Sequence, residues 1–223
     1  GQVDLDHVAG ALNHDGKKVL EKIRSLGEKL GDSEYQEQLQ KAGEMASEAI
    51  NAKQDRFDRE ELQHMGDNLL KIKRDLNKIR RENLVPIREK ELSHLEEFYH
   101  DVIENHANPA EKDQFQKLFH TAELAIERED SEFERMLQEV RYRNYDVLSH
   151  SDEFIVHDFE RLIADDPYEY IDEDKFYQLK DAGNQAIQQN DIKTLRTVVD
   201  YLWSLRRDKR EDGMDTAANI TRG

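Results

Sequence analysis

The residues best suited to chemistry form three Glu-x-x-His pairs, which are Glu61 with His64, Glu91 with His94 and Glu97 with His100. Helical bundles that hold two iron ions use this motif twice, on separate helices, and take further glutamates from two other helices. The second and third pairs begin six residues apart, about 240° around a helix, so they cannot share one site. A di-iron carboxylate enzyme therefore stays an alternative for which the remaining ligands cannot be named.

Other catalytic patterns are missing from the sequence. No two histidines stand four residues apart as in metalloprotease helices, and the glycines of LGEKLGD (26–32) mark helix ends and do not form a phosphate loop. Serines and histidines lack the strand–turn–helix context of a nucleophile elbow. With no cysteine there is also no thiolate nucleophile and no cysteine-based zinc site. We expect no catalytic residue, no metal and no cofactor, and hence no enzyme activity.

A basic segment is the first candidate for binding. Residues 71–82, KIKRDLNKIRRE, hold six basic and two acidic side chains in a chain of net charge −17. Such a segment can contact RNA or phosphate, or it can form the outer face of a helix that pairs with acidic neighbours. We expect the second arrangement.

An aromatic and acidic segment is the second candidate. Residues 166–179, DPYEYIDEDKFYQL, place Tyr168, Tyr170 and Tyr177 among five acids. Exposed on a turn, these tyrosines would form a patch that binds a protein partner. The alternative is that Phe176 and one tyrosine fill the end of a helical bundle.

The elements that must position these residues are helices. Only ten Gly and three Pro occur, straight-chain residues dominate, and clusters of β-branched residues are almost absent. The chain is 36% hydrophobic and 37% charged, which suits helices that bury one stripe and expose the rest. We predict an all-α fold of antiparallel hairpins and bundles, elongated, which can divide into two helical subdomains.

The sharpest apolar stripe alternates spacings of three and four residues. Its members are Leu62, Met65, Leu69, Ile72, Leu76 and Ile79. This is the seam of a coiled coil, but two and a half heptads also suit packing inside a bundle, which we expect. Upstream, a short helix is predicted over residues 5–12, with a break near residues 13–16 and a second helix that Gly31 ends.

Pro86 interrupts the register of this stripe. Val85 is disfavoured in the helical region because it precedes proline, so a kink or a new helix is expected here. We therefore predict an N-terminal subdomain over residues 1–84 and a C-terminal bundle of hairpins over 85–206. The segment 207–223 loses periodicity and is predicted to be a flexible tail.

Two stretches run an apolar stripe into a polar break and then restart it. They are ELAIEREDSEFERMLQEV (123–140) and NQAIQQNDIKTLRTVVDYLW (184–203). Each break is predicted to be a tight connection between antiparallel helices, in which Asn and Asp side chains bond to free amides. Asn108 and Pro109 likewise predict the start of a helix.

The charge and hydropathy of the chain exclude some partners. A net charge of −17 opposes generic binding to nucleic acid or anionic membranes. No apolar run approaches the roughly 20 residues of a membrane span. The absence of cysteine is consistent with a cytoplasmic location.

The last third of the chain carries a family resemblance. FIVHDFERLI (154–163) and AGNQAIQQNDIKTLRTVVDYLWSL (182–205) resemble the C-terminal helical region of divergent DnaK-like proteins of the seventy-kilodalton heat-shock chaperone family. Residues 25–50 look similar to the helical segment beyond the substrate-binding part of such proteins. The match depends on Ala186, Ile187, Asn190, Asp191, Leu195, Val198, Val199 and Leu202.

This resemblance implies a piece of a chaperone without its ATPase loops or peptide-binding β-sandwich. The implied role is a non-enzymatic helical module that contacts clients or co-factor proteins, while an N-terminal part preceding Gly1 would carry any ATPase. The alternative is a helical scaffold or adaptor unrelated to chaperones.

Overall fold

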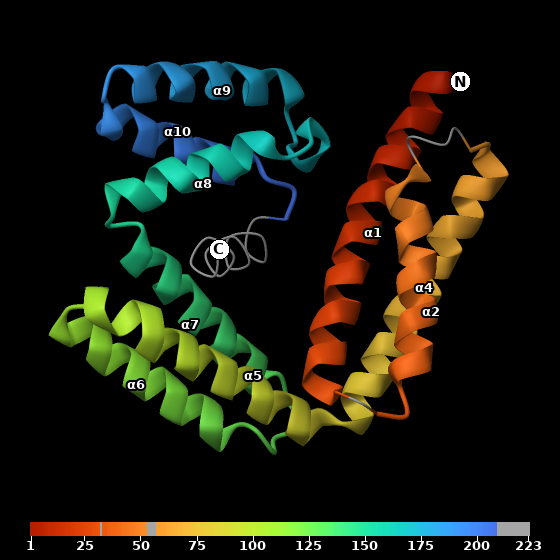
Figure 1. Ribbon diagram of the computed structural model, residues 1–223, viewed down its shortest axis with the longest axis horizontal. Helices are drawn as coiled ribbons and strands as arrows, with labels where there is room; N and C mark the ends of the chain where they lie inside the picture. The colour runs from red at the N-terminus through yellow and green to blue at the C-terminus, as the bar shows by residue number, and fades with distance from the viewer. Residues whose placement is uncertain (32, 53–56, 209–223) are drawn as a thin grey trace. The chain divides into compact units, whose positions relative to one another are not determined.

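Helices joined by short connections make up the described part of the chain (Figure 1). The computed structural model describes residues 1–31, 33–52 and 57–208. In these residues no strand forms, and a single isolated bridge pairs Tyr170 with Arg206. The predicted all-α class is confirmed. The chain divides into two compact units between Glu91 and Leu92.

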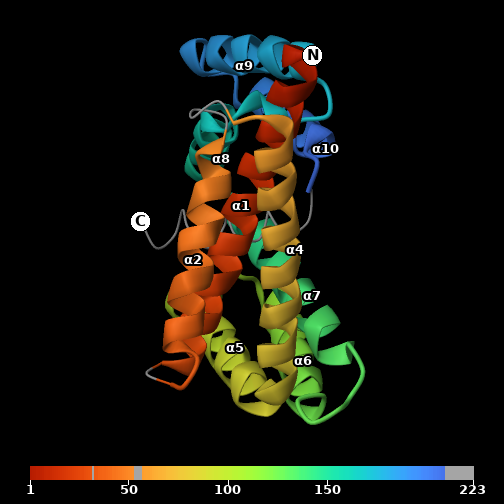
Figure 2. The ribbon, with the colours of Figure 1, turned by 90° about the vertical axis from the view of Figure 1, so that its right-hand side faces the viewer.

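Unit 1 is built from three long helices and the start of a fourth. Helices α1 (Gln2–Leu30), α2 (Gln36–Ile50) and α4 (Arg59–Glu82) pack against one another, and α2 and α4 lie side by side in Figure 2. All six residues of the predicted stripe on α4 are buried in the core of this unit. The stripe therefore packs inside a bundle, as expected.

Helix α1 runs without a break through residues 13–16, so the predicted interruption there is wrong. Gly16 instead lies against α2, where an added Cβ would approach the carbonyl oxygen of Ala46 to 3.0 Å. The Asn13 side chain donates a hydrogen bond to the carbonyl oxygen of Ile50 in the same region. The small and polar residues that resemble a helix end thus form a close contact between α1 and α2.

The helix α5 (Leu84–Phe98) begins directly after Asn83. Pro86 lies in its first turn, where the missing backbone donor has no partner to lose. A new helix therefore starts here, which was one of the two expected outcomes. The division between the units falls inside α5, after Glu91, whereas the sequence placed it after residue 84.

Unit 2 continues from the second half of α5 through a π-helical turn (Tyr99–Ile103) and a 3-10 turn (Glu104–His106). Its helices are α6 (Pro109–Leu124), α7 (Glu132–Leu148), α8 (Asp152–Ala164), α9 (Glu173–Gln188) and α10 (Ile192–Leu205). Asn108 caps α6 by accepting from the amide of Glu111, as predicted. Aromatic side chains fill much of this core, including Tyr99, Phe115, Phe133, Phe159 and Phe176.

Both predicted hairpins form in unit 2. Between α9 and α10, Asn190 adopts a left-handed conformation with φ of 52°, and Asp191 accepts from the amide of Thr194 at 3.1 Å. Between α6 and α7, Asp130 accepts from the amide of Glu132 at 3.1 Å. Asp side chains satisfy a free amide at both connections, as the sequence indicated, whereas Asn190 contributes its left-handed backbone conformation.

The end of α10 is tied back to the segment before α9. The amide of Ile171 donates to the carbonyl oxygen of Leu205, and the amide of Arg207 donates to that of Glu169. The predicted tail starts at residue 207, but Arg207 is held by this pairing. Residues 209–223 of the predicted tail lie outside the described residues.

Candidate interaction surface

Tyr170 was expected in an exposed patch, and the structure shows that this is wrong. Its side chain is 1% exposed and its hydroxyl donates to the carbonyl oxygen of Leu162 at 2.7 Å. The ring packs on Phe176 with centroids 4.5 Å apart. Burial raises the pKa of the hydroxyl, because the phenolate would lose its hydration. Phe176 and one tyrosine thus fill the core, which was the alternative.

The other two tyrosines lie closer to solvent. Tyr168 is half-buried, and the guanidinium of Arg207 lies over its ring at 4.6 Å from the centroid. Tyr177 is 47% exposed on α9, and Ile171, just before this helix, is 59% exposed. Tyr177 therefore remains a candidate contact, whereas the structure does not gather the three tyrosines into one patch.

In two of the Glu-x-x-His pairs the glutamate has a structural partner. Glu61 accepts from the amide of Asp58 at 3.0 Å and completes the cap of α4. Glu91 pairs with Arg80 at 2.8 Å and with Lys29 at 3.4 Å. These carboxylates hold helices in place.

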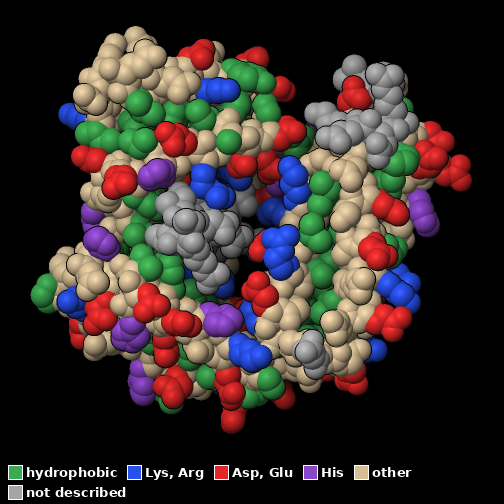
Figure 3. All heavy atoms as spheres, in the orientation of Figure 1, with side chains coloured by type: hydrophobic (Ala, Val, Ile, Leu, Met, Phe, Trp, Pro, Cys, Tyr) green, Lys and Arg blue, Asp and Glu red, His purple; other side chains and the backbone are tan. Residues whose placement is uncertain are grey.

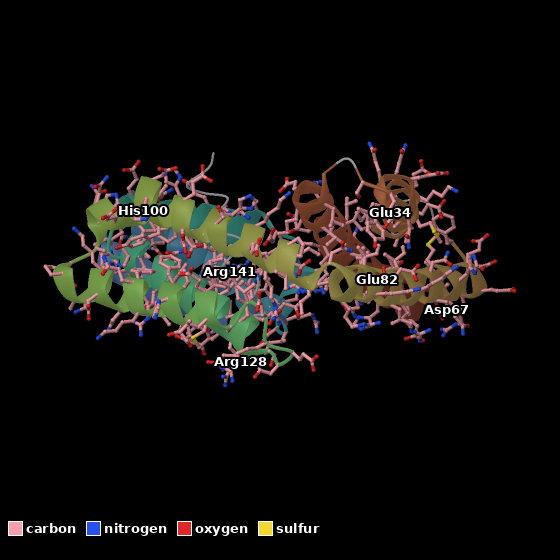
Figure 4. All side chains as sticks on the ribbon, turned by 90° about the horizontal axis from the view of Figure 1, so that it is seen from below. Glu34, Asp67, Glu82, His100, Arg128 and Arg141 are labelled. Atoms are coloured by element: carbon pink, nitrogen blue, oxygen red, sulfur yellow. The ribbon has the colours of Figure 1, made fainter. Side chains whose placement is uncertain are left out.

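The remaining pair lies on the surface. Glu97 and His100 are exposed, and the Nδ1 of His100, labelled in Figure 4, is 2.9 Å from Glu104. Histidines are scattered over the face seen in Figure 3. Among residues 1–31, 33–52 and 57–208 no three His, Asp or Glu side chains are arranged to hold a metal ion.

A groove between α2 and α4 was not foreseen from the sequence. It has a volume of about 210 Å³, and its lining combines apolar floor residues with a few polar side chains at the edges. Leu39 and Leu76 are buried in the floor, while Ala42 and Met45 are partly exposed. Its lining is Gln38, Leu39, Lys41, Ala42 and Met45 from α2, and Lys71, Ile72, Asp75, Leu76 and Ile79 from α4.

The basic segment forms an exposed row on α4, which we call the basic row. Lys71, Arg74, Lys78 and Arg81 are all exposed and are spaced by three, four and three residues, so they share one helix face. In the described part of the chain none of these four has an ion-pair partner. The expected outer position is confirmed. The expected pairing with an acidic neighbour forms at Arg80 of the same segment, which pairs with Glu91, but not at the four residues of the basic row.

Asp67 and Glu82, labelled in Figure 4, flank the basic row at its two ends. Asp75 is half-buried and lines the groove, so no exposed acid stands among the four cations between them. The potentials of neighbouring positive charges add, so such a row raises the local positive potential and favours a negative partner.

A matching row of opposite sign lies on α2, which we call the acidic row. Glu37, Glu44 and Glu48 are exposed, and Lys41 stands between the first two. The spacing of four, three and four residues again places them on one helix face. Lys41 pairs with Glu37 at 3.4 Å, so the row remains acidic overall.

The two rows could have been found from their spacing, but the groove could not. Ala42 appears in the sequence as one member of an apolar stripe. Only the packing of α2 on α4 shows that this small side chain leaves a depression opposite Leu76 and Ile79. Groove depth depends on helix spacing, which periodicity does not report.

A buried carboxylate in unit 2 has the perturbed acidity often seen in active sites. Asp158 accepts from the hydroxyl of Tyr145 at 2.5 Å and from Nε1 of Trp203 at 2.9 Å. Burial raises its pKa, and these two hydrogen bonds oppose the rise. Since Asp158 is 0% exposed, no solute reaches it, and the arrangement connects α7, α8 and α10.

Comparison with models of protein families, with curated proteins and with solved structures found no match for this chain. The resemblance to DnaK-like chaperones therefore stays a prediction. Among the described residues, no helix combines the length and apolar character that a membrane crossing requires.

Proposed function

We propose that this chain is a non-enzymatic helical module that binds other proteins, with the groove between α2 and α4 as its docking surface. The groove is the observation that carries the proposal. An apolar floor between two helices with charged edges is the surface on which amphipathic helices and exposed apolar segments bind. The partly exposed Ala42 and Met45 offer apolar area that a partner would cover.

The resemblance in the last third of the chain supports a narrower form of this proposal. In that form the chain is the helical C-terminal module of a cytoplasmic DnaK-like chaperone and contacts unfolded clients or co-factor proteins. Unfolded clients expose apolar side chains, which the groove floor would bind. A helical scaffold unrelated to chaperones would use the same groove for one folded partner.

Binding of an unfolded protein tests the narrower form. The probe is a fluorescently labelled model protein that has been reduced and alkylated so that it cannot fold, and the measurement is fluorescence anisotropy. Ala42→Glu places a carboxylate on the groove floor, so we expect binding to weaken about tenfold or more, because apolar contact is lost and a charge must be desolvated.

The matched control is Gln40→Glu, which makes the same charge change at an exposed position of α2 outside the groove lining. It should bind as the wild type does. Equal binding by Ala42→Glu and the wild type would contradict the groove as the docking surface. No binding of the unfolded probe by any form would reject the chaperone version.

Measurement of phosphate release from ATP tests the non-enzymatic character. We expect the purified chain to release no phosphate from ATP above the buffer rate, because no glycine-rich phosphate loop is present in its sequence. Robust hydrolysis by the chain would contradict the proposal.

A further inference from the structure

The face that α2 and α4 share is divided by charge. The acidic row, spanning residues 37–48, lies on one side of the groove, and the basic row, spanning residues 71–81, lies on the other. At 1.5 Å per residue, the two rows are about 16 Å and about 15 Å long. Both are centred on the groove, whose lining covers residues 38–45 of α2 and 71–79 of α4.

The two helices run in opposite directions along the groove. The hydroxyl of Tyr35, at the start of α2, donates to Glu82, at the end of α4, at 3.0 Å. The side chain of Asn83 donates to the same hydroxyl at 3.2 Å. At the other end, Glu48 borders the same hollow as Asp58 and Glu61. Figure 2 shows the two helices side by side.

We propose that a second copy of this chain docks on this face as a two-fold symmetric dimer. A two-fold axis that lies in the plane of the interface, parallel to the helices and centred over the groove, places α2 of each copy over α4 of the other. Each acidic row then meets a basic row of similar length, twice in the dimer. A surface of this kind is self-complementary, as a two-fold interface requires. This inference names the partner at the groove and in that respect rests on the proposed function.

The charges on the face exclude simpler partners. An acidic protein or a nucleic acid would be attracted by the basic row but repelled by the adjacent acidic row, and the net charge of −17 adds to that repulsion. The occupant must present bases over α2 and acids over α4, at matching lengths. The chain itself carries both rows, and the small Ala42 at the centre lets two groove floors approach.

Charge reversal tests the dimer. One variant, Glu44→Lys with Glu48→Lys, makes the acidic row basic. The other, Arg74→Glu with Lys78→Glu and Arg81→Glu, makes the basic row acidic. Each variant alone places like charges across both contacts, so we expect its self-association to weaken about tenfold or more relative to the wild type. Sedimentation equilibrium up to about 100 µM measures this against the monomer mass of 26.3 kDa.

Mixing the two variants provides the decisive measurement. In a mixed dimer each reversed row faces a row of the opposite sign, so the mixture should associate as the wild type does. A chain carrying all five substitutions should likewise recover self-association. These rescues also show that the substituted chains remain folded. Association of the wild type should weaken as salt is added, because exposed charges are screened.

Three results would overturn the inference. The first is a wild-type chain that stays monomeric over the whole concentration range. The second is a dimer that neither reversal weakens, or that mixing does not restore. The third is binding of a labelled single-stranded RNA that the variant with the acidic α4 row abolishes, which would assign the basic row to nucleic acid.

The two proposals can fail separately. If the wild-type chain is monomeric and binds the unfolded probe, and Ala42→Glu abolishes this binding, the proposed function is supported and the dimer is overturned. A dimer that responds to charge reversal as expected, without binding the unfolded probe, supports this inference and rejects the chaperone version.

Discussion

Gly183 is the residue at which α9 and α8 leave no room for a side chain. An added Cβ would lie 2.1 Å from Cε2 of Phe159, whose ring is fully buried. The ring has no free space to move into, because protein cores are closely packed. We predict that Gly183→Ala lowers the free energy of unfolding by about 1–3 kcal/mol, since overpacking outweighs the higher helix propensity of alanine. Urea denaturation measures the change.

A second substitution distinguishes overpacking from a general effect on the helix. Phe159→Leu removes the ring atoms that the new Cβ meets. The cost of Gly183→Ala should therefore be smaller in a chain that already carries Phe159→Leu than in the wild type, which a double-mutant cycle shows. Additive effects of the two substitutions would contradict the proposed clash.

Asp158 makes the stability of unit 2 depend on pH. In the unfolded chain its carboxyl titrates near pH 3.9, whereas burial raises its pKa in the folded chain. Between these two values the folded state binds more protons than the unfolded state. The free energy of unfolding is therefore highest below the unfolded pKa and falls as the pH rises through the folded pKa.

Replacing Asp158 with asparagine should remove this dependence. The amide does not titrate, and its oxygen accepts the hydrogen bonds from Tyr145 and Trp203. We predict that the unfolding free energy of Asp158→Asn rises relative to the wild type as the pH increases from the unfolded pKa of about 3.9 towards the raised folded pKa, by about 1.4 kcal/mol for each unit of pKa displacement. Denaturation at several pH values, followed by Trp203 fluorescence, measures the difference.

An exposed carboxylate provides the control. Asp200 lies on the solvent side of α10. Asp200→Asn makes the same chemical change outside the core, so it measures how much of the difference comes from the loss of a carboxylate alone. A difference between wild type and Asp158→Asn that stays constant over the pH range would falsify the burial argument.

At the scale of elements, the approach of α1 to α2 depends on Gly16. An added Cβ would lie 3.0 Å from the carbonyl oxygen of Ala46, which is backbone and cannot move aside without shifting the helix. We predict that Gly16→Ala lowers the unfolding free energy of unit 1 by about 1–3 kcal/mol. Thermal unfolding followed by circular dichroism measures the loss.

Gly27 lies in the same helix and provides the matched control. A Cβ there would be 3.9 Å from Leu39, which is ordinary contact. Gly27→Ala should therefore raise stability by up to about 1 kcal/mol, because alanine is the better helix former. Equal effects of the two substitutions would show that helix propensity, and not the contact with α2, decides the outcome.

The same contact explains why the helices were easier to predict than their lengths. Apolar spacing identified the six buried residues of α4, because a helix that buries one face has apolar residues at every third or fourth position. Asn13 and Gly16 resemble a helix end, yet they contact residues of α2 that lie 30 or more positions away in the chain. Local propensity cannot distinguish a helix end from a close helix crossing.

The candidate surface was predictable in part for a similar reason. The basic row stood out as a run of charge, and its exposed position followed from the apolar stripe on the opposite side of α4. Tyr170 was misplaced because a tyrosine among acids resembles surface until its hydroxyl is seen to reach Leu162. The groove depends on how α2 and α4 pack against each other, and the residue pattern of either helix alone does not predict this packing.

At the scale of the whole molecule, each unit has its own hydrophobic core. The cluster in unit 1 runs from Ala9 to Ile87, and the cluster in unit 2 runs from Leu92 to Leu202, with no residue in common. Helix α5 provides the covalent connection between them. Because hydrophobic burial is the main source of cooperativity, units with separate cores can unfold as separate transitions.

The single tryptophan allows this independence to be measured. Trp203 packs on Tyr145 in unit 2, so its fluorescence reports that unit alone, whereas circular dichroism reports both. We predict that Gly16→Ala lowers the midpoint of part of the circular dichroism transition and leaves the fluorescence midpoint unchanged. Gly183→Ala should instead lower the fluorescence midpoint by several degrees. If Gly16→Ala moves both signals together, the two cores are energetically coupled and the chain unfolds as one cooperative body.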